Sequence, residues 1–343
     1  MRSVLLRGCL AAAIAGAVLG GTPAVPQVFP RDRIWFAPAP GSLDLLRLFE
    51  SVDEWPRARQ TLDVFKFYHQ HTFAEPPDIV GPNSYDALVR VDAFRKLRQW
   101  GKRVALEAGS VKEFYCTADD SGMRESIELT LRGLEAVHAA GGLVSYLAMD
   151  EPFLAGQAPQ CGGPALEPTA DRVSQYIRAV RQRFPAIRIG LIEAYPYFRP
   201  EAFASMLRLL KERGTPAAFL HVDAYLPALQ EGRDAFGSDM IRLADVSAAS
   251  RIPFGIIIWG ENGNADHLYA ADALKLAEAV SRTFRGWDVM PDHLIFQSWA
   301  ESSTGLRITP TNLPEQQADT HTRLLNDIYR TFREVVIPAT RRR

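Results

Sequence analysis

The sequence predicts an α/β protein that forms a single (β/α)8 TIM barrel. Eight short β-rich runs follow one another along the chain, and amphipathic helical patterns fill the intervals between them. Strands that alternate with helices build a parallel sheet with the helices outside, and eight such units close a barrel. The length of 343 residues fits one barrel of this kind.

The eight runs are rich in aliphatic and aromatic side chains. An open, doubly wound sheet is the alternative arrangement of such units. No run is followed by a G-x-G-x-x-G or P-loop pattern, so nucleotide binding has no support. The runs cover residues 33–40, 62–71, 103–110, 142–152, 188–196, 218–227, 253–262 and 293–303.

Helical patterns occupy the intervals between the runs. The pattern over 84–101 opens with Ser84 and ends at Gly101, as helix start and stop signals should. The interval 42–61 is the weakest, because Pro56 interrupts it, and 156–168 is predicted to be a long loop. The other predicted helices cover 123–142, 168–184, 200–214, 239–251, 271–284 and 319–336.

Composition and charge narrow the class of protein. Hydrophobic residues make up 47% of the chain and charged residues 23%, with a formal net charge of −1. This is an ordinary globular composition with material for a large core. The near-neutral charge gives no basic footprint for nucleic acid or for an anionic membrane.

The N-terminus predicts a secretory signal peptide over residues 1–24. Two arginines precede an apolar, uncharged run, and small residues follow it up to Ala24. The run is short for a membrane span, although an uncleaved anchor is the alternative. We therefore expect a secreted or periplasmic protein, a monomer, whose catalytic domain covers residues 25–343.

Acidic and aromatic residues gather near the C-terminal ends of the predicted strands. In a barrel of this class the functional residues come from those ends, so these side chains are the candidate site. They are Lys66 and Tyr68 on the second strand, Glu107 on the third, Asp150 and Glu151 on the fourth, Glu193 on the fifth, His221, Asp223 and Tyr225 on the sixth, Trp259 and Glu261 on the seventh, and Trp299 and Glu301 on the eighth.

Crowded carboxyl groups need a physical reason, because they repel one another and burial raises their pKa further. A site that keeps one carboxyl protonated and another ionised uses such differences. Aromatic rings suit sugars, which have apolar faces edged by hydroxyls. The pattern therefore predicts a glycosidase, although Glu193 and Asp223 could instead pair with Arg or Lys at the rim.

The residues at two strand ends resemble the clan A glycoside hydrolases. In that clan an acid/base Glu ends strand four, commonly within Asn-Glu-Pro, and a nucleophilic Glu ends strand seven. This chain has Asp150-Glu151-Pro152 on strand four and Glu261 on strand seven. The resemblance thus implies Glu151 as the acid/base and Glu261 as the nucleophile. The clan's strand-eight Trp corresponds to Trp299, and its strand-six His or Tyr to His221 and Tyr225.

Two departures from the clan pattern stand out. Asp150 replaces the usual Asn, and an ionised Asp can only accept hydrogen bonds. Its charge also disfavours ionisation of Glu151, which helps to keep that group protonated. Glu261 is followed by Asn and Gly, so a small register change would redirect it, and Glu301 is the fallback partner.

Two other functions compete with the glycosidase. His69 and His71 have the H-x-H spacing of amidohydrolase-like metal sites, but strand five lacks the His and strand eight the Asp that such sites want. A non-catalytic carbohydrate-binding barrel would keep Trp259, Trp299 and Tyr225 as stacking platforms and use the acids only for hydrogen bonds.

The two cysteines of the predicted mature chain lie in neighbouring loops. Cys116 follows the third strand and Cys161 the fourth, on the same face of the barrel. A disulfide at the rim of the cleft and two separate thiols are both open. The sequence as a whole predicts a secreted, retaining glycoside hydrolase that acts on a poly- or oligosaccharide and needs no metal or organic cofactor.

Overall fold

The computed structural model describes residues 32–225, 227, 233–287, 290–305 and 308–341. The predicted signal peptide lies outside these ranges, so its cleavage and the export of the protein stay predictions. No helix within the described ranges is both long enough and apolar enough to cross a membrane.

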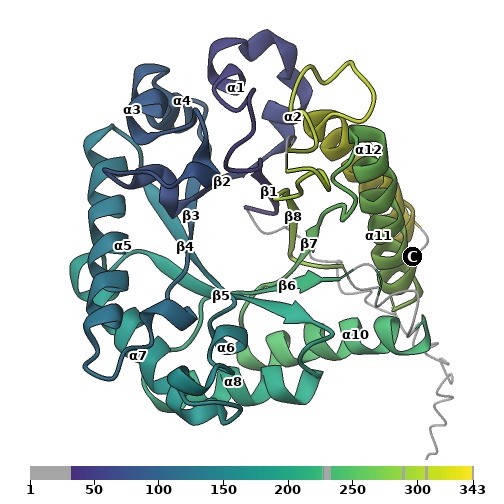
Figure 1. Cartoon of the computed structure of the whole chain (residues 1–343). Coiled ribbons are helices and arrows are strands. Elements are labelled where there is room, and N and C mark those ends of the chain that lie inside the picture. The colour runs from purple at the N-terminus through teal and green to yellow at the C-terminus, as the bar shows by residue number, and fades with distance from the viewer. Residues whose placement is uncertain (1–31, 226, 228–232, 288–289, 306–307, 342–343) are drawn as a thin grey trace, which may run out of the picture.

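Eight parallel strands form a closed barrel in chain order, which confirms the predicted (β/α)8 TIM barrel (Figure 1). Pairing of Ile34 with Leu294 and of Ala37 with Gln297 joins the first strand to the last. Each strand lies within one of the eight predicted runs. The strands are β1 (Ile34–Ala37), β2 (Val64–Tyr68), β3 (Arg103–Ala108), β4 (Val144–Asp150), β5 (Arg188–Tyr195), β6 (Leu220–Ala224), β7 (Phe254–Ile258) and β8 (His293–Gln297).

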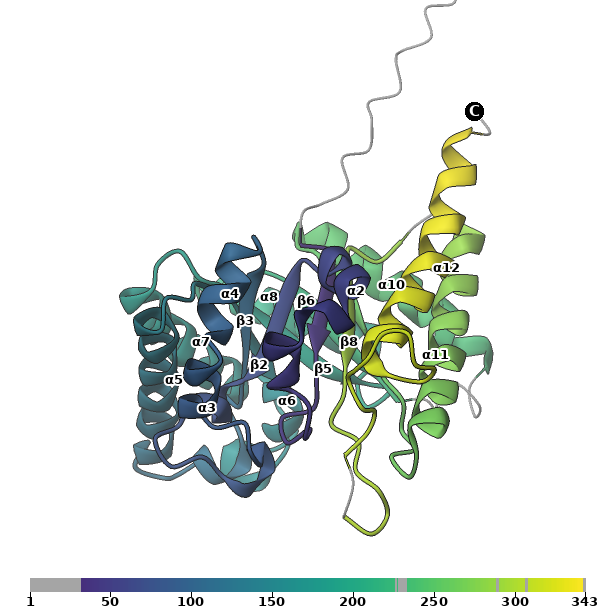
Figure 2. The same ribbon diagram turned by 90° about the horizontal axis from the view of Figure 1, so that it is seen from above.

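Long helices cover the outside of the barrel, where the sequence predicted them (Figure 1). The last two of them lie side by side on one flank (Figure 2). The long helices are α5 (Ser121–Ala139), α7 (Leu166–Arg183), α8 (Pro200–Glu212), α10 (Arg233–Ser250), α11 (Asp266–Trp287) and α12 (His321–Arg341).

Three intervals differ in detail from the prediction. The helix expected over 84–101 is divided in two, because Asp92 has a left-handed backbone with a φ of 59°. Pro56 starts a helix rather than breaking one, since the first helical position needs no N–H donor. The expected loop over 156–168 contains a short 3-10 turn. The short helices are α1 (Arg47–Glu50), α2 (Pro56–Thr61), α3 (Tyr85–Arg90), α4 (Ala93–Gln99) and α6 (Pro152–Ala155), and the turn is Pro159–Cys161.

Aromatic side chains fill the interior near the N-terminal ends of the strands. The fully buried ring of Trp35 lies 4.8 Å from the ring of Tyr146, and its other ring neighbours include Phe219 and His221. The hydroxyl of Tyr146 donates to the Asp32 carboxylate at 2.6 Å. This layer plugs one end of the barrel, so a ligand can reach the interior only from the C-terminal ends of the strands.

A buried carboxylate ties the loop after β1 to the segment after β8. Asp44 accepts hydrogen bonds from the backbone N–H groups of Asn312 and Leu313 and from the Asn312 side chain, at 2.7 to 3.0 Å. These two segments meet where the first and last strands pair. The three bonds therefore reinforce the closure of the barrel.

We predict that Asp44→Ala lowers the free energy of unfolding by about 3 kcal/mol, because it leaves buried donors without acceptors. Asp53→Ala is the matched control, since Asp53 is exposed, and its effect should stay within about 0.5 kcal/mol. Urea unfolding of both variants measures the difference. Equal stabilities would show that the Asp44 contacts do not support barrel closure.

Candidate active site

A cavity of about 640 Å³ lies at the C-terminal ends of the strands. Most of the residues that the sequence proposed for the site line it, together with several that it did not propose. The lining residues are Tyr68, Glu107, Asp150, Glu151, Ile192, Ala194, Tyr195, Pro196, Tyr197, Asp223, Tyr225, Ile257, Trp259, Gln297 and Trp299.

Glu151 reaches the cavity through an unusual backbone conformation. Its φ of 45° and ψ of 48° are left-handed, a conformation that costs a non-glycine residue of order 1 kcal/mol. Its N–H donates to the carbonyl of Ile192 at 3.0 Å, and its carbonyl accepts from Ala155 at 3.0 Å. The strand thus ends at Asp150, Pro152 starts α6, and the strained residue between them lies at the cavity. Strain held by surrounding bonds in this way is typical of functional positions.

Two of the four carboxyl groups in the cavity have their own lysine. Lys66 lies fully buried and donates to both the Glu107 carboxylate and the side-chain oxygen of Gln297. Lys112, in the loop after β3, places its Nζ 2.7 Å from the carboxylate of Asp150. Burial raises the pKa of Glu107, and the charge of Lys66 opposes that rise. The pair with Lys112 explains how an Asp is accommodated where the resembling enzymes carry an Asn.

The other two carboxyl groups, Glu151 and Asp223, have no salt-bridge partner among the described residues. Burial, reinforced by the charge of Asp150, raises the pKa of Glu151 to about 7. Burial also raises the pKa of Asp223 well above its usual range, and the charge of Glu151 adds to that rise. The buried Oδ1 of Asp223 has no hydrogen-bond partner among the residues that the structure describes. These two groups therefore hold a proton at a pH where ordinary carboxyl groups are ionised.

Aromatic side chains form part of the cavity wall that also contains Glu151 and Asp223. The rings of Trp259 and Trp299 lie 4.7 Å apart, and the indole N–H of Trp259 donates to the carbonyl of Ala224 at 3.1 Å. Tyr225 and Tyr197 are 46% and 60% exposed, so part of each side chain faces solvent at the mouth of the cavity. The cavity thus combines broad apolar faces with a few polar groups, as ligand sites do.

Three of the candidate site residues, Glu193, His221 and Lys66, lie away from the cavity surface. Glu193 alternates with Ile192 and Ala194, which face the cavity, so its side chain points to the helix side of β5. There its carboxylate accepts from the backbone N–H of Phe153 at 2.8 Å and from Leu154, and it caps α6. Of the other two, His221 lies in the aromatic plug and contacts His293 at 2.9 Å, and Lys66 lies beneath Glu107.

Neither Glu261 nor Glu301 is among the side chains that line the cavity. β7 ends at Ile258, and the chain then turns sharply toward α11. A Cβ on Gly260 would lie 2.1 Å from the carbonyl oxygen of Tyr269, so this turn packs tightly against the helix. Glu261, which the sequence implied as the nucleophile, therefore lies outside the cavity lining that includes Glu151. Glu301, the fallback partner, is exposed, and its backbone forms an isolated antiparallel β-bridge with Ile308.

The ring nitrogens of the H-x-H pair contact backbone carbonyls. His71 contacts the carbonyls of Tyr68 and Pro40 with its two nitrogens, and Nδ1 of His69 contacts the carbonyl of Glu107. Within the described part of the chain, no group of three or more His, Cys, Asp or Glu side chains is placed to hold a metal ion. The residues present do not fit the metal-dependent alternative.

Several functional side chains escaped the sequence analysis. Gln297, which contacts both Glu107 and Tyr68, lies two residues before Trp299, so strand alternation was a usable signal for it. Tyr195 and Tyr197 also line the cavity, but strand alternation was no signal for Tyr195, because it shares the side of Glu193 and its hydroxyl donates to Asp239 on α10 at 2.9 Å. Lys112 lies in a loop, where no periodic pattern indicates which way a side chain points.

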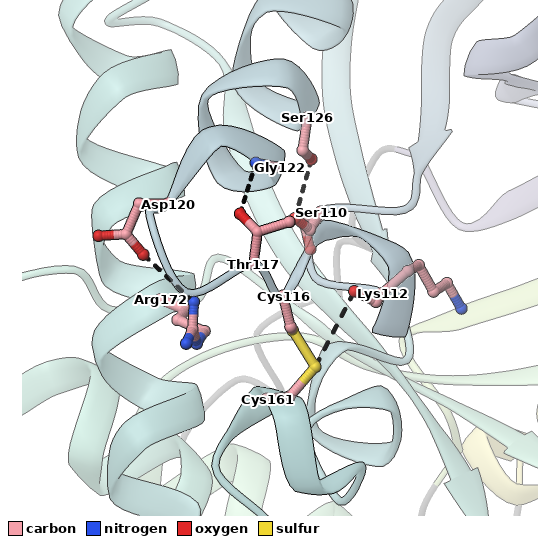
Figure 3. Close-up of a disulfide and its surroundings, with 9 residues drawn as sticks. All are labelled: Ser110, Lys112, Cys116, Thr117, Asp120, Gly122, Ser126, Cys161 and Arg172. Carbon is pink, nitrogen blue, oxygen red and sulfur yellow. Dashed lines mark hydrogen bonds and ion pairs between the residues drawn. A yellow bond between two sulfur atoms is a disulfide. The ribbon is translucent and has the colours of Figure 1, made fainter.

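A disulfide joins Cys116 and Cys161, whose Cα atoms lie 5.0 Å apart (Figure 3). It links the loop after β3 to the 3-10 turn after α6. Of the two arrangements that the sequence left open, the structure therefore contains the disulfide.

No protein-family model matches the sequence, and no curated protein matches it either. The solved structures that resemble it are similar in fold. A glucosidase from Croceicoccus marinus aligns with a TM-score of 0.53 and 15% identity over 88% of this chain and 68% of its own. A D-psicose 3-epimerase crystallised with D-fructose aligns with a TM-score of 0.51 and 12% identity over 88% of this chain and 99% of its own.

A third solved structure, N2152 from Neocallimastix frontalis, aligns with a TM-score of 0.51 and 13% identity over 78% of this chain. The matched region spans 61% of the N2152 chain. At these identities the similarity establishes the TIM-barrel fold, and the choice among activities depends on the cavity itself.

We predict that Glu151 makes the folded protein less stable as pH rises from about 4.5 to 7. The pKa of Glu151 is about 7 in the folded protein and about 4.3 in an unfolded chain, so between these values the folded state binds the extra proton. Glu151→Gln removes this dependence. The stability of the variant minus that of the wild type should therefore increase with pH across this range in urea unfolding. A difference that is constant from pH 4.5 to 7 would contradict the raised pKa.

Proposed function

We propose that this protein is a glycoside hydrolase in which Glu151 and Asp223 are the catalytic pair. The observation that carries the proposal is that these two carboxyl groups form no salt bridge with a described residue while lining one aromatic-walled cavity. Hydrolysis of a glycosidic bond needs one carboxyl group that donates a proton and a second that is ionised. The glucosidase and epimerase folds support a sugar as the substrate, since both names describe enzymes that act on sugars.

Binding of a sugar would distribute the proton correctly between the two groups. A sugar hydroxyl that donates to the buried, unpartnered Oδ1 of Asp223 favours the ionised form of Asp223. The proton of the pair then resides on Glu151, whose pKa of about 7 suits a general acid near neutral pH.

The chemical steps follow from this distribution. Glu151 protonates the glycosidic oxygen as its bond to the anomeric carbon breaks, and the carboxylate of Asp223 attacks that carbon to form a glycosyl-enzyme. Glu151, now ionised, takes a proton from water, and the resulting hydroxide displaces Asp223 and regenerates both groups. Asp223 on β6 thus replaces Glu261 as the partner of Glu151.

Export from the cytoplasm belongs to the same proposal. The N-terminal pattern of residues 1–24 is typical of a secretory signal, and the disulfide between Cys116 and Cys161 suits an oxidising compartment. Mass spectrometry of the mature N-terminus tests whether the segment is removed.

We predict that Glu151→Gln and Asp223→Asn each lower kcat/KM by about 10²- to 10⁴-fold on the best aryl glycoside found by screening. Glu261→Gln is the matched control, because Glu261 lies outside the cavity lining, and it should retain activity within about twofold. Steady-state kinetics on the three variants measure these effects.

Full activity of either cavity variant would disprove the pair, and a large loss in Glu261→Gln would restore the strand-seven carboxylate. If the wild type binds oligosaccharides but hydrolyses none of them, the protein is a carbohydrate-binding barrel instead.

We also predict selectivity for sugars without a negative charge. Lys and Arg are absent from the described residues that line the cavity, and the nearby Lys66 and Lys112 already pair with Glu107 and Asp150. An anionic group a few ångströms from Asp223 would be repelled by the Asp223 carboxylate that the mechanism requires. Aryl glucosides and the matching aryl glucuronides, compared for each anomer that is cleaved, should differ about 100-fold in kcat/KM. Equal rates would show that the cavity charge does not select the substrate.

A further inference from the structure

The disulfide braces the loop that carries Lys112. Cys116 and Cys161 are both buried, and the sulfur of Cys161 lies 3.9 Å from the backbone oxygen of Lys112. Figure 3 shows that the side chain of Lys112 extends from this point away from the disulfide. The backbone of Lys112 is therefore held in place within the loop after β3, while its Nζ reaches the carboxylate of Asp150 on β4.

The loop is also fastened to the start of α5. Ser126 donates to the carbonyl of Ser110 at 2.8 Å, and the N–H of Gly122 donates to the hydroxyl of Thr117 at 3.0 Å (Figure 3). A Cβ on Gly122 would lie 2.6 Å from the carbonyl oxygen of Tyr115, so only glycine allows the helix to approach this closely. These contacts lie on both sides of the disulfide and fix the path of the loop.

Lys112 is a cation that influences the charge of Glu151. Its Nζ contacts the carboxylate of Asp150 at 2.7 Å, and its side chain is only 20% exposed, so solvent screens the pair weakly. Lys112 lowers the pKa of Glu151, and Asp150 raises it. The other charged groups that face Glu151 are acidic: Glu107 on β3, Glu113 in the loop, Glu193 on β5 and Asp223 on β6.

We propose that the Cys116–Cys161 disulfide, Lys112 and Asp150 form a rim clamp that fixes a charged pair beside Glu151, which makes Lys112 a positioning residue for the acid. The proposal rests on the proposed function only for the role of Glu151 as the acid. The clamp explains the presence of Asp150, because a carboxylate there is balanced only while the disulfide-braced loop delivers the lysine. An amide at this position would need no such partner.

The two members of the charged pair act in opposite directions on Glu151. Without the lysine, the negative charge of Asp150 is no longer balanced, so Glu151 should hold its proton to higher pH. Without the Asp150 charge, the lysine faces Glu151 directly, so the proton should leave at lower pH. Opening the disulfide should resemble loss of the lysine, because the loop no longer holds Nζ at Asp150.

The experiment measures the titration of Glu151 by NMR of protein labelled with ¹³C at the glutamate carboxyl carbon. The Glu151 signal is assigned by its absence in Glu151→Gln. Lys112→Met should raise the Glu151 titration midpoint by on the order of one pH unit, and Asp150→Asn should lower it by a similar amount. Cys116→Ser combined with Cys161→Ser should raise it by part of the Lys112→Met effect.

Arg172→Gln is the matched control for loosening the same loop. Arg172 on α7 contacts Asp120 at 3.5 Å, so this variant removes a tie to the loop without touching Lys112 (Figure 3). Its Glu151 midpoint should equal that of the wild type. Thermal melts confirm that each variant is folded, and Lys112→Met, which retains the disulfide, tests the clamp even where the double serine variant unfolds.

An unchanged midpoint in Lys112→Met would overturn the clamp. An unchanged midpoint in a folded double serine variant would show that the disulfide is not part of the clamp. Because no substrate is present, these outcomes do not depend on hydrolysis. A shifted midpoint in a protein that cleaves no glycoside would support the clamp and refute the proposed function.

Discussion

The chemistry of this protein depends on an unequal distribution of positive charge among four carboxyl groups at one end of the barrel. Lys66 forms a salt bridge with Glu107, and Lys112 forms one with Asp150. Glu151 and Asp223 line the same cavity without a salt-bridge partner among the described residues. Placing carboxylates in a desolvated site without counter-ions costs free energy, which the site lowers by keeping protons on them. The two lysines thus offset the charge of Glu107 and Asp150, whereas Glu151 and Asp223 form no such salt bridge.

The remainder of the fold keeps that distribution in place. The aromatic layer around Trp35 closes the N-terminal end, so the cavity has one mouth. The buried side chain of Glu193 accepts hydrogen bonds from backbone N–H groups of α6, and this helix begins directly after Glu151. A carboxyl group outside the cavity therefore helps to hold the strained backbone of the proposed acid.

The fold was predictable because its signals are local and repeated eight times. Each strand is a short apolar run and each helix an amphipathic one, so errors at Pro56 and Asp92 changed helix boundaries without changing the topology. The rule that functional residues lie at strand ends then selected Glu151, Asp223 and most of the aromatic side chains that line the cavity. It failed at Glu193 and Glu261, because one residue of alternation or one tight turn decides which way a side chain points.

Hydrophobic periodicity along the chain was enough to predict that eight β/α units close a barrel, because it specifies the strands, the helices and their order. The sequence also determined that acids and aromatic residues would collect at one end. The salt-bridge partners of these acids depend on the three-dimensional fold. Lys66 reaches Glu107 from a neighbouring strand, and Lys112 reaches Asp150 from a loop that is held by a disulfide to Cys161. Charge pairing depends on distances between segments that are far apart in the chain, and no pattern along the sequence encodes those distances.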